Sequence, residues 1–133
     1  MAKILCTGSH PALIELRKAV LEGAGHTVVT IVEPGDVAAV CNETSFDVAI
    51  IGQSIGPESR GATASAIRQH CASVKILELY PWNQSKGIKD ADAWLEAPVL
   101  ARDLIQCIAE LSNPKLVQWP GGLRKGDALK DSE

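Results

Sequence analysis

Short apolar runs alternate along the chain with longer segments in which apolar residues recur every three or four positions. The short runs predict strands that are buried on both faces, and the longer segments predict helices with one apolar side. The predicted strands are 3–7, 27–32, 48–51, 75–79 and 93–96. The predicted helices are 11–24, a short one opened by Pro34, 58–70 and 98–112.

The segment between the fourth and fifth strands, 81–92, contains a proline and a glycine and has little periodicity. Any helix in it is expected to be short or irregular. The element order is therefore β-α repeated five times. This order predicts a parallel sheet covered by helices on both faces, with right-handed crossovers and functional loops at the carboxyl ends of the strands.

The first helix is predicted in most detail. Pro11 suits its first turn, and Ser9 or His10 suits the cap before it. The apolar side is predicted to face the core, and it consists of Leu13, Leu16, Val20 and Ala24. The opposite, polar side is predicted to consist of Glu15, Arg17, Lys18 and Glu22.

Composition narrows the class of protein. The chain has 133 residues, of which 46% are hydrophobic and 22% charged, and its formal net charge is −3. These values are typical of one globular domain, here 1–112, and not of a general nucleic-acid binder. No signal peptide or apolar run of ~18 residues is present, so we expect a cytoplasmic protein without membrane contact. Residues 113–133 are expected to form a largely extended or mobile tail.

The four cysteines are spaced about 30 residues apart and form no CxxC pair. This spacing is poor for a zinc site, and a cytosolic setting argues against disulfides. We therefore expect all four to be small buried apolar residues. They are Cys6, Cys41, Cys71 and Cys107.

Four blocks of the sequence resemble the receiver domains of bacterial response regulators, of which the chemotaxis receiver is one. The blocks are KILCTGSHPALIELRKAVLEGAGHTV, SFDVAIIGQSIGP, VKILEL and DADAWLEAP. They cover residues 3 to about 112 in the family's order and spacing, apart from a shortened region before the fifth strand. The resemblance implies a flavodoxin-like, doubly wound (βα)5 three-layer sandwich with sheet order 2-1-3-4-5. It also implies phosphorelay-type two-component signal transduction and a cis Ala97–Pro98 peptide bond.

The chemically active positions of the family depart from its pattern. A typical receiver has two acidic Mg²⁺ ligands, a phosphoacceptor aspartate, a Ser or Thr, and a Lys before a proline. The resemblance places these functions at Gly8 and Ser9, Gly52, Leu79 and Ala97, respectively. Phosphoryl transfer needs a nucleophile, a bridging cation and a donor, and none of these side chains fits. Asp47 begins the third strand, so it lies at the wrong end of the sheet.

We therefore predict a degenerate, unphosphorylated receiver that has no catalytic, cofactor or metal residues and is not an enzyme. It would act as a protein–protein interaction module, with Trp82, Trp94 and Trp119 as candidate interface anchors. A homodimer through the last strand and the last helix is one form that this interface can take. The alternative for the tryptophans is that they cover the core under a weak fourth helix.

Two other functions stay open on the sequence. Residues 6–11, CTGSHP, are similar to the phosphocysteine loop of sugar-phosphotransferase B components, with Cys6 as the carrier. A small-anion sensor would instead use the emptied pocket at Gly8, Ser9 and Gly52.

Three further side chains are candidates for chemistry. Glu78 and Glu96 are candidates for general acid–base catalysis, although the favoured interpretation is that both carboxylates are solvated surface charges. His10 is a candidate for phosphorylation or metal binding, although a capping role is favoured.

Overall fold

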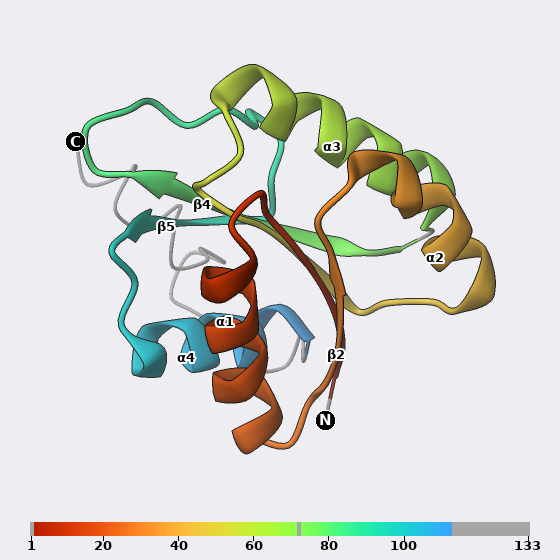
Figure 1. Cartoon of the computed structure of the whole chain (residues 1–133). Helices are drawn as coiled ribbons and strands as arrows, with labels where there is room; N and C mark the ends of the chain where they lie inside the picture. The colour runs from red at the N-terminus through yellow and green to blue at the C-terminus, as the bar shows by residue number, and fades with distance from the viewer. Residues whose placement is uncertain (1, 72, 113–133) are drawn as a thin grey trace, which may run out of the picture.

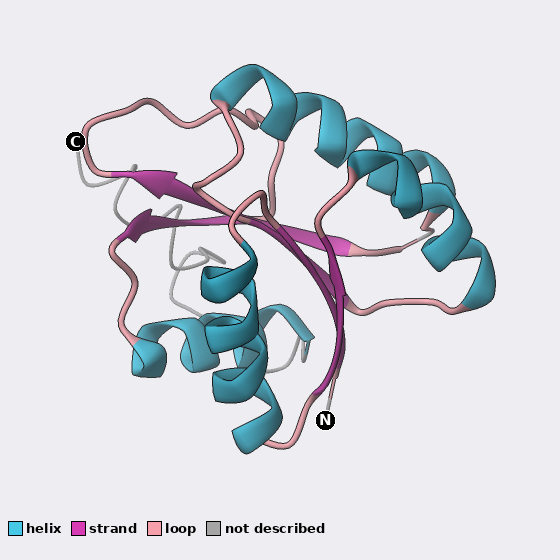
Figure 2. Ribbon diagram, viewed as in Figure 1, coloured by secondary structure: helices cyan, strands magenta, loops and turns pink. Residues whose placement is uncertain are grey.

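The computed structural model of the protein describes residues 2–71 and 73–112. A parallel sheet forms its middle layer (Figures 1 and 2). The strands are β1 (Lys3–Thr7), β2 (Thr27–Ile31), β3 (Val48–Ile51), β4 (Lys75–Pro81) and β5 (Ala93–Ala97). The sheet order is β2-β1-β3-β4-β5, and all four neighbouring pairs are parallel. The predicted flavodoxin-like fold is therefore confirmed, including its strand order.

Helices cover the sheet on both faces (Figure 1). The helices are α1 (Pro11–Gly23), the 3-10 turn η1 (Pro34–Asp36), α2 (Val37–Glu43), α3 (Pro57–His70) and α4 (Ala101–Ser112). Helices α1 and α4 share one apolar layer with the sheet, and α2 and α3 share the other. The peptide bond between Ala97 and Pro98 is cis, as predicted.

Side chains of β3 show how the two apolar layers form. Successive residues in a strand point to opposite faces of a sheet. Val48 and Ile50 accordingly join the layer under α1 and α4, whereas Ala49 and Ile51 join the layer under α2 and α3. All four residues are fully buried, because helices cover both faces. This explains why the strand is apolar throughout and not alternating.

The expected fourth β-α unit differs from the structure, because the described connection from β4 to β5 contains no helix. Glu78 organises this connection by accepting the backbone N–H groups of Gly87 at 2.6 Å and Ile88 at 2.9 Å. Arg60 on α3 donates from Nε to the same carboxylate at 2.6 Å and from Nη2 to the Ser85 carbonyl at 3.3 Å. A buried ion pair thus holds an irregular loop where helical periodicity is missing.

The interpretation of Glu78 as a solvated charge is therefore wrong. Both Glu78 and Arg60 are 0% exposed. The carboxylate has its charge compensated and its oxygens hydrogen-bonded, which is the condition for burying a charge. Glu96 is exposed, as expected.

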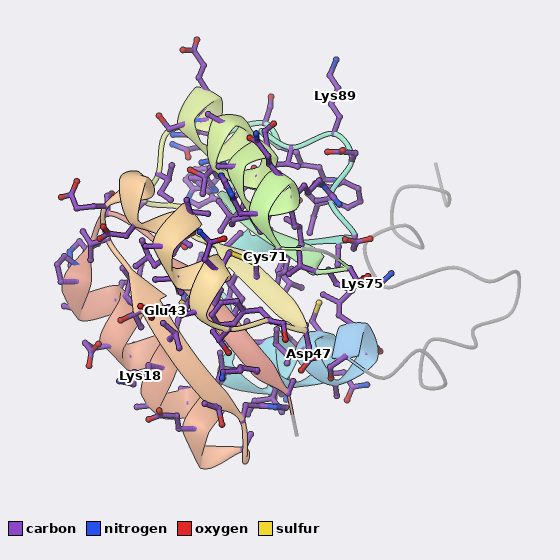
Figure 3. All side chains as sticks on the ribbon, turned by 90° about the vertical axis from the view of Figure 1, so that its right-hand side faces the viewer. Lys18, Glu43, Asp47, Cys71, Lys75 and Lys89 are labelled. Atoms are coloured by element: carbon purple, nitrogen blue, oxygen red, sulfur yellow. A yellow bond between two sulfur atoms is a disulfide. The ribbon has the colours of Figure 1, made fainter. Side chains whose placement is uncertain are left out.

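A disulfide joins Cys41, in α2, to Cys71, directly after α3 (Figure 3). The expectation that the chain has no disulfide is therefore wrong. Helices α2 and α3 pack against each other on one face of the sheet and bring the two Cα atoms to 5.4 Å. This distance is typical of disulfides, although the residues lie 30 positions apart in the chain. Cys6 and Cys107 are buried, as predicted.

Two expectations from the sequence concern the ends of the domain and the membrane. In residues 2–71 and 73–112, no helix has both the length and the apolar character of a membrane span. The tail 113–133, with Trp119, lies outside the described residues. The extended or mobile tail and the role of Trp119 as an interface anchor therefore stay predictions.

Candidate functional site

The loops after β1 and β3 meet at the carboxyl-terminal edge of the sheet. The Ser9 backbone N–H donates to Ser54 Oγ at 3.0 Å, and Ser9 Oγ donates to the Ser54 carbonyl at 2.8 Å. The Gly52 backbone N–H donates to the Thr7 carbonyl at 3.1 Å. These bonds tie the two loops together, and the Gly8 Cα atom lies 3.7 Å from the point at which a Cβ would stand on Gly52.

Two of the five predicted positions lie deeper in the fold. Leu79 is fully buried inside β4, which continues to Pro81, two residues beyond the predicted end. Ala97 is buried at the end of β5 and pairs with Pro81. Neither side chain contributes a polar group to the carboxyl-terminal edge.

The residue that sequence reasoning missed is Arg17. Its side chain was assigned to the polar side of α1, but Arg17 is only 6% exposed and lies on the buried side with Ile14 and Leu21. Leu16, assigned to the core, is 61% exposed. The prediction of which side of α1 faces the core is therefore wrong. Arginine carries a long apolar stem, so helical periodicity alone does not show which side is buried.

The guanidinium of Arg17 lies directly over Gly52. A Cβ atom on residue 52 would lie 2.9 Å from Arg17 Nη1 and 2.9 Å from the Thr7 carbonyl oxygen. Real Cβ atoms essentially never approach other atoms so closely, so one of these groups would have to move. Any side chain on residue 52 would therefore meet a cationic group and a backbone oxygen at its first atom.

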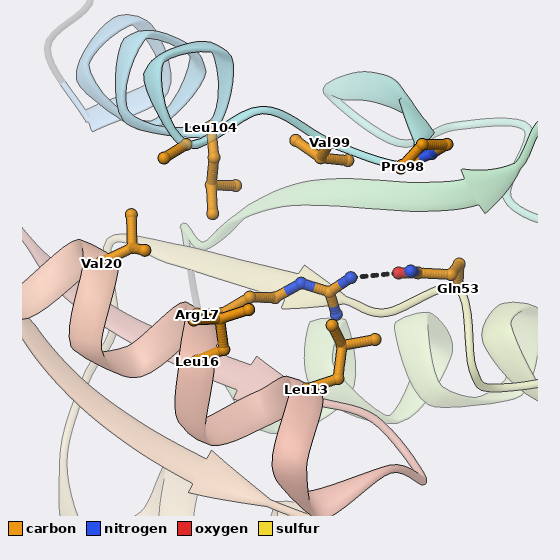
Figure 4. A pocket seen from close by; sticks show the side chains of 9 residues that line it. Leu13, Leu16, Arg17, Val20, Gln53, Pro98, Val99 and Leu104 are labelled. Carbon is orange, nitrogen blue, oxygen red and sulfur yellow. Dashed lines mark hydrogen bonds between the residues drawn. The ribbon is translucent and has the colours of Figure 1, made fainter.

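A cavity of about 360 Å³ opens beside this guanidinium, between α1 and the start of α4 (Figure 4). Its walls are mostly apolar. The lining residues are Leu13, Leu16, Arg17, Val20, Gln53, Pro98, Val99, Ala101 and Leu104. The apolar side of α1 that was expected in the core therefore lines an open groove.

The electrostatics of the site come from Arg17 and Cys6. Arg17 Nη2 donates to the side-chain oxygen of Gln53, whereas the buried Nη1 has no hydrogen-bond partner among the described residues. Burial lowers the pKa of Arg17, and the negative charge of the Cys6 thiolate form opposes this effect. Burial raises the pKa of Cys6 to about 11, although the Arg17 charge lowers it.

Cys6 lies inside β1 and is 0% exposed, so it is not part of the loop that a phosphocysteine carrier would use. His10 is the N-cap of α1, and its Nδ1 accepts the Leu13 backbone N–H at 3.4 Å. The capping interpretation of His10 is therefore confirmed.

Asp47 lies at the opposite end of the sheet, where its Oδ2 accepts the Lys3 backbone N–H at 2.8 Å. The Asp47 carbonyl accepts the Lys75 backbone N–H at 3.0 Å, and both residues are labelled in Figure 3. In residues 2–71 and 73–112, no group of three His, Cys, Asp or Glu side chains is arranged to hold a metal ion.

The two described tryptophans differ in exposure. Trp82, directly after β4, is 71% exposed. Trp94 in β5 is 7% exposed and donates from its indole N–H to the Ile88 carbonyl at 2.9 Å. The Lys86 ammonium lies 4.7 Å from the centre of the Trp94 ring. Trp94 therefore supports the β4–β5 connection and has little surface to offer a partner.

The comparisons with known proteins agree with this architecture. No family model matches the chain. No curated protein sequence matches it either. A response regulator receiver domain protein from Clostridium thermocellum superposes with a TM-score of 0.75 at 23% identity, covering 86% of this chain and 97% of the other. The chemotaxis protein CheY4 of Vibrio cholerae gives 0.72 at 22% identity, covering 84% and 98%.

A larger protein is also similar. NtrX from Brucella abortus, solved in complex with ADP, gives a TM-score of 0.74 at 16% identity. The match covers 84% of this chain but only 26% of NtrX. Together these likenesses show that the chain shares the fold of receiver domains.

Proposed function

We propose that this chain is a receiver domain that has lost its phosphorylation site and that works by binding other proteins in a bacterial, phosphorelay-type signalling pathway. The shared fold and the four sequence blocks support the receiver assignment. The loss of phosphorylation rests on one observation, which is the Arg17 guanidinium lying over the side-chain position of residue 52.

The chemistry of the edge supports the same conclusion. Gly8 has no ligand atom for Mg²⁺, and the Ser9 hydroxyl already donates to the Ser54 carbonyl. A guanidinium at the centre of the edge repels a divalent cation. Ala97 has no ammonium group that could stabilise charge on a transferred phosphoryl group. The edge therefore lacks a nucleophile, ligands for a bridging cation and the lysine ammonium of a typical receiver.

Phosphorylation can be tested directly by intact-mass measurement. The full chain is incubated with acetyl phosphate and Mg²⁺ beside a receiver domain that retains its aspartate. We expect the control to gain a phosphoryl group and this chain to keep its mass. A phosphoryl group mapped to any carboxylate of this chain would contradict the proposal.

The proposed interaction surface centres on Trp82. This side chain is exposed immediately after β4, the strand that neighbours the edge strand β5. Large aromatic side chains are common energetic anchors of protein interfaces. A homodimer that uses β5 and α4 would bring two such surfaces together around a twofold axis.

Sedimentation velocity over a range of concentrations tests this dimer. We expect the wild-type chain to form a dimer at high concentration and Trp82→Ala to shift toward monomer. Lys89→Ala, an exposed change in the same connection, should behave like the wild type. A wild-type chain that stays monomeric at every concentration would reject the homodimer.

The phosphocysteine carrier gains no support from the structure. A phosphoryl carrier needs an accessible thiolate, because the thiolate is the nucleophilic form. Cys6 is fully buried, and its pKa is raised to about 11.

A further inference from the structure

The positive charge of Arg17 has no anionic partner among the described residues. In residues 2–71 and 73–112, the arginines that form ion pairs are Arg60 and Arg68. Arg17 is nevertheless only 6% exposed, and its Nη1 has no hydrogen-bond partner among these residues. Its one side-chain partner, Gln53, is neutral. A buried cation without an anion is costly, so an anion bound beside it would be stabilising.

The groove between α1 and α4 has room for that anion. Figure 4 shows the Arg17 side chain extending from α1 toward Gln53, with Pro98, Val99 and Leu104 across the cavity. The cavity volume of about 360 Å³ is at the lower end of the range of small-molecule sites. Arg17 and Gln53 are thus the polar side chains in an otherwise apolar lining.

The polar and apolar groups that line the cavity determine which kind of anion fits it. The cavity offers one guanidinium and the amide of Gln53, and the rest of its lining is apolar. A phosphate would leave several oxygens without donors and a second charge without a counter-ion. A carboxylate carries one charge and matches the planar guanidinium. An apolar body on the same molecule would cover the leucine and valine side chains of the walls.

We propose that the groove between α1 and α4 binds a small monocarboxylic acid with an aromatic or branched aliphatic body. The carboxylate pairs with Arg17, the Gln53 amide serves as the second polar contact, and the body packs between Leu13 and Val99. The cavity is too small for a long acyl chain, so the ligand is a compact acid and not a fatty acid. This site goes beyond the proposed signalling function and does not depend on it.

Binding can be tested with the full chain and two defined probes, phenylacetate and 4-methylpentanoate. A ligand that binds only the folded state raises the melting temperature with concentration. We expect both acids to do so and to cause saturable NMR shifts in the methyl groups of Leu13, Val20, Val99 and Leu104. Phenylacetamide, which keeps the ring but lacks the charge, and inorganic phosphate should have no comparable effect.

Two outcomes of this titration would overturn the proposal. Equal binding of phenylacetate and its neutral amide would mean that the guanidinium does not select the ligand. Absence of any shift with either acid up to about ten millimolar, where even weak complexes are populated, would mean that the groove is not a carboxylate site.

Variants separate the role of the charge from that of the groove. Arg17→Met should weaken binding of phenylacetate by at least about tenfold, as the loss of a charge-assisted contact requires. Arg102→Met, which removes an exposed arginine from α4, should leave binding unchanged. Ala101→Trp adds a large side chain at a residue that lines the groove, keeps Arg17, and should also abolish binding. Unchanged affinity in Arg17→Met or in Ala101→Trp would contradict the assignment, whatever the result of the phosphorylation experiment.

Discussion

The Nη1 atom of Arg17 lies 2.9 Å from the point at which a Cβ atom would stand on residue 52. The Thr7 carbonyl oxygen lies equally close to that point. Gly52 is therefore required by packing, in addition to offering no nucleophile. One arginine from α1 thus restricts the space at residue 52 and also places a buried positive charge beside the groove.

We expect Gly52→Ala to be destabilising. The added methyl group meets a guanidinium and a backbone oxygen, and overpacking of this kind costs about 1–3 kcal/mol. Urea unfolding followed by circular dichroism measures the change in the free energy of unfolding. Gly23→Ala is the matched control, because a Cβ at Gly23 would meet nothing within 4 Å. Equal stability of the two variants would show that the close approach is not real.

The double variant Gly52→Ala, Arg17→Met tests whether the two residues are coupled. Methionine is flexible and uncharged, so it can move away from the new methyl group. The double variant should therefore lose less stability than the sum of the two single changes. Strict additivity would mean that the Thr7 carbonyl alone causes the strain.

The buried pair of Arg60 and Glu78 gives a second prediction. Removing one partner leaves the other charge buried and uncompensated, which costs about 3–5 kcal/mol. Arg60→Met should therefore lower the free energy of unfolding strongly, and Arg60→Met with Glu78→Leu should lower it less. Chemical denaturation of both variants measures this, with Glu96→Gln, at an exposed position, as the control. A mild effect of Arg60→Met alone would contradict the buried ion pair.

The disulfide between Cys41 and Cys71 closes a loop of 30 residues. Loop-closure entropy predicts that its loss lowers the free energy of unfolding by about 3–4 kcal/mol. Denaturation of Cys41→Ser with Cys71→Ser, compared with the oxidised wild type, measures this loss. A reductant should destabilise the wild type by a similar amount and leave the double variant unchanged. A wild type insensitive to reductant would mean that the two sulfurs are not bonded in solution.

Cys6 should be unreactive in the folded protein. Its thiol is fully buried, and its pKa is raised to about 11, so almost no thiolate is present at pH 8. Mass spectrometry after treatment with iodoacetamide at pH 8 should show no label at Cys6 in the native state and labelling in denaturant. The native rate should rise as pH approaches 11. Rapid native labelling at pH 8 would reopen the phosphocysteine interpretation.

Element positions could be predicted from the sequence because they depend on neighbouring residues. Buried strands need uninterrupted apolar residues, and Val48–Ile51 is apolar at every position. The start of α1 could be predicted for the same reason, because Pro11 and His10 act within one helical turn. The irregular 81–92 segment was also foreseen, although the complete absence of a helix there was not.

The sequence by itself therefore determined the parallel α/β class, the strand positions and the lack of a nucleophile at Gly52. Only the tertiary structure decided that Arg17 is buried, that Glu78 is paired with Arg60, and that Cys41 meets Cys71. The physical reason is that strands and caps form between residues a few positions apart. The buried charges and the disulfide instead join residues 18 or more positions apart, which meet only when helices pack on the sheet.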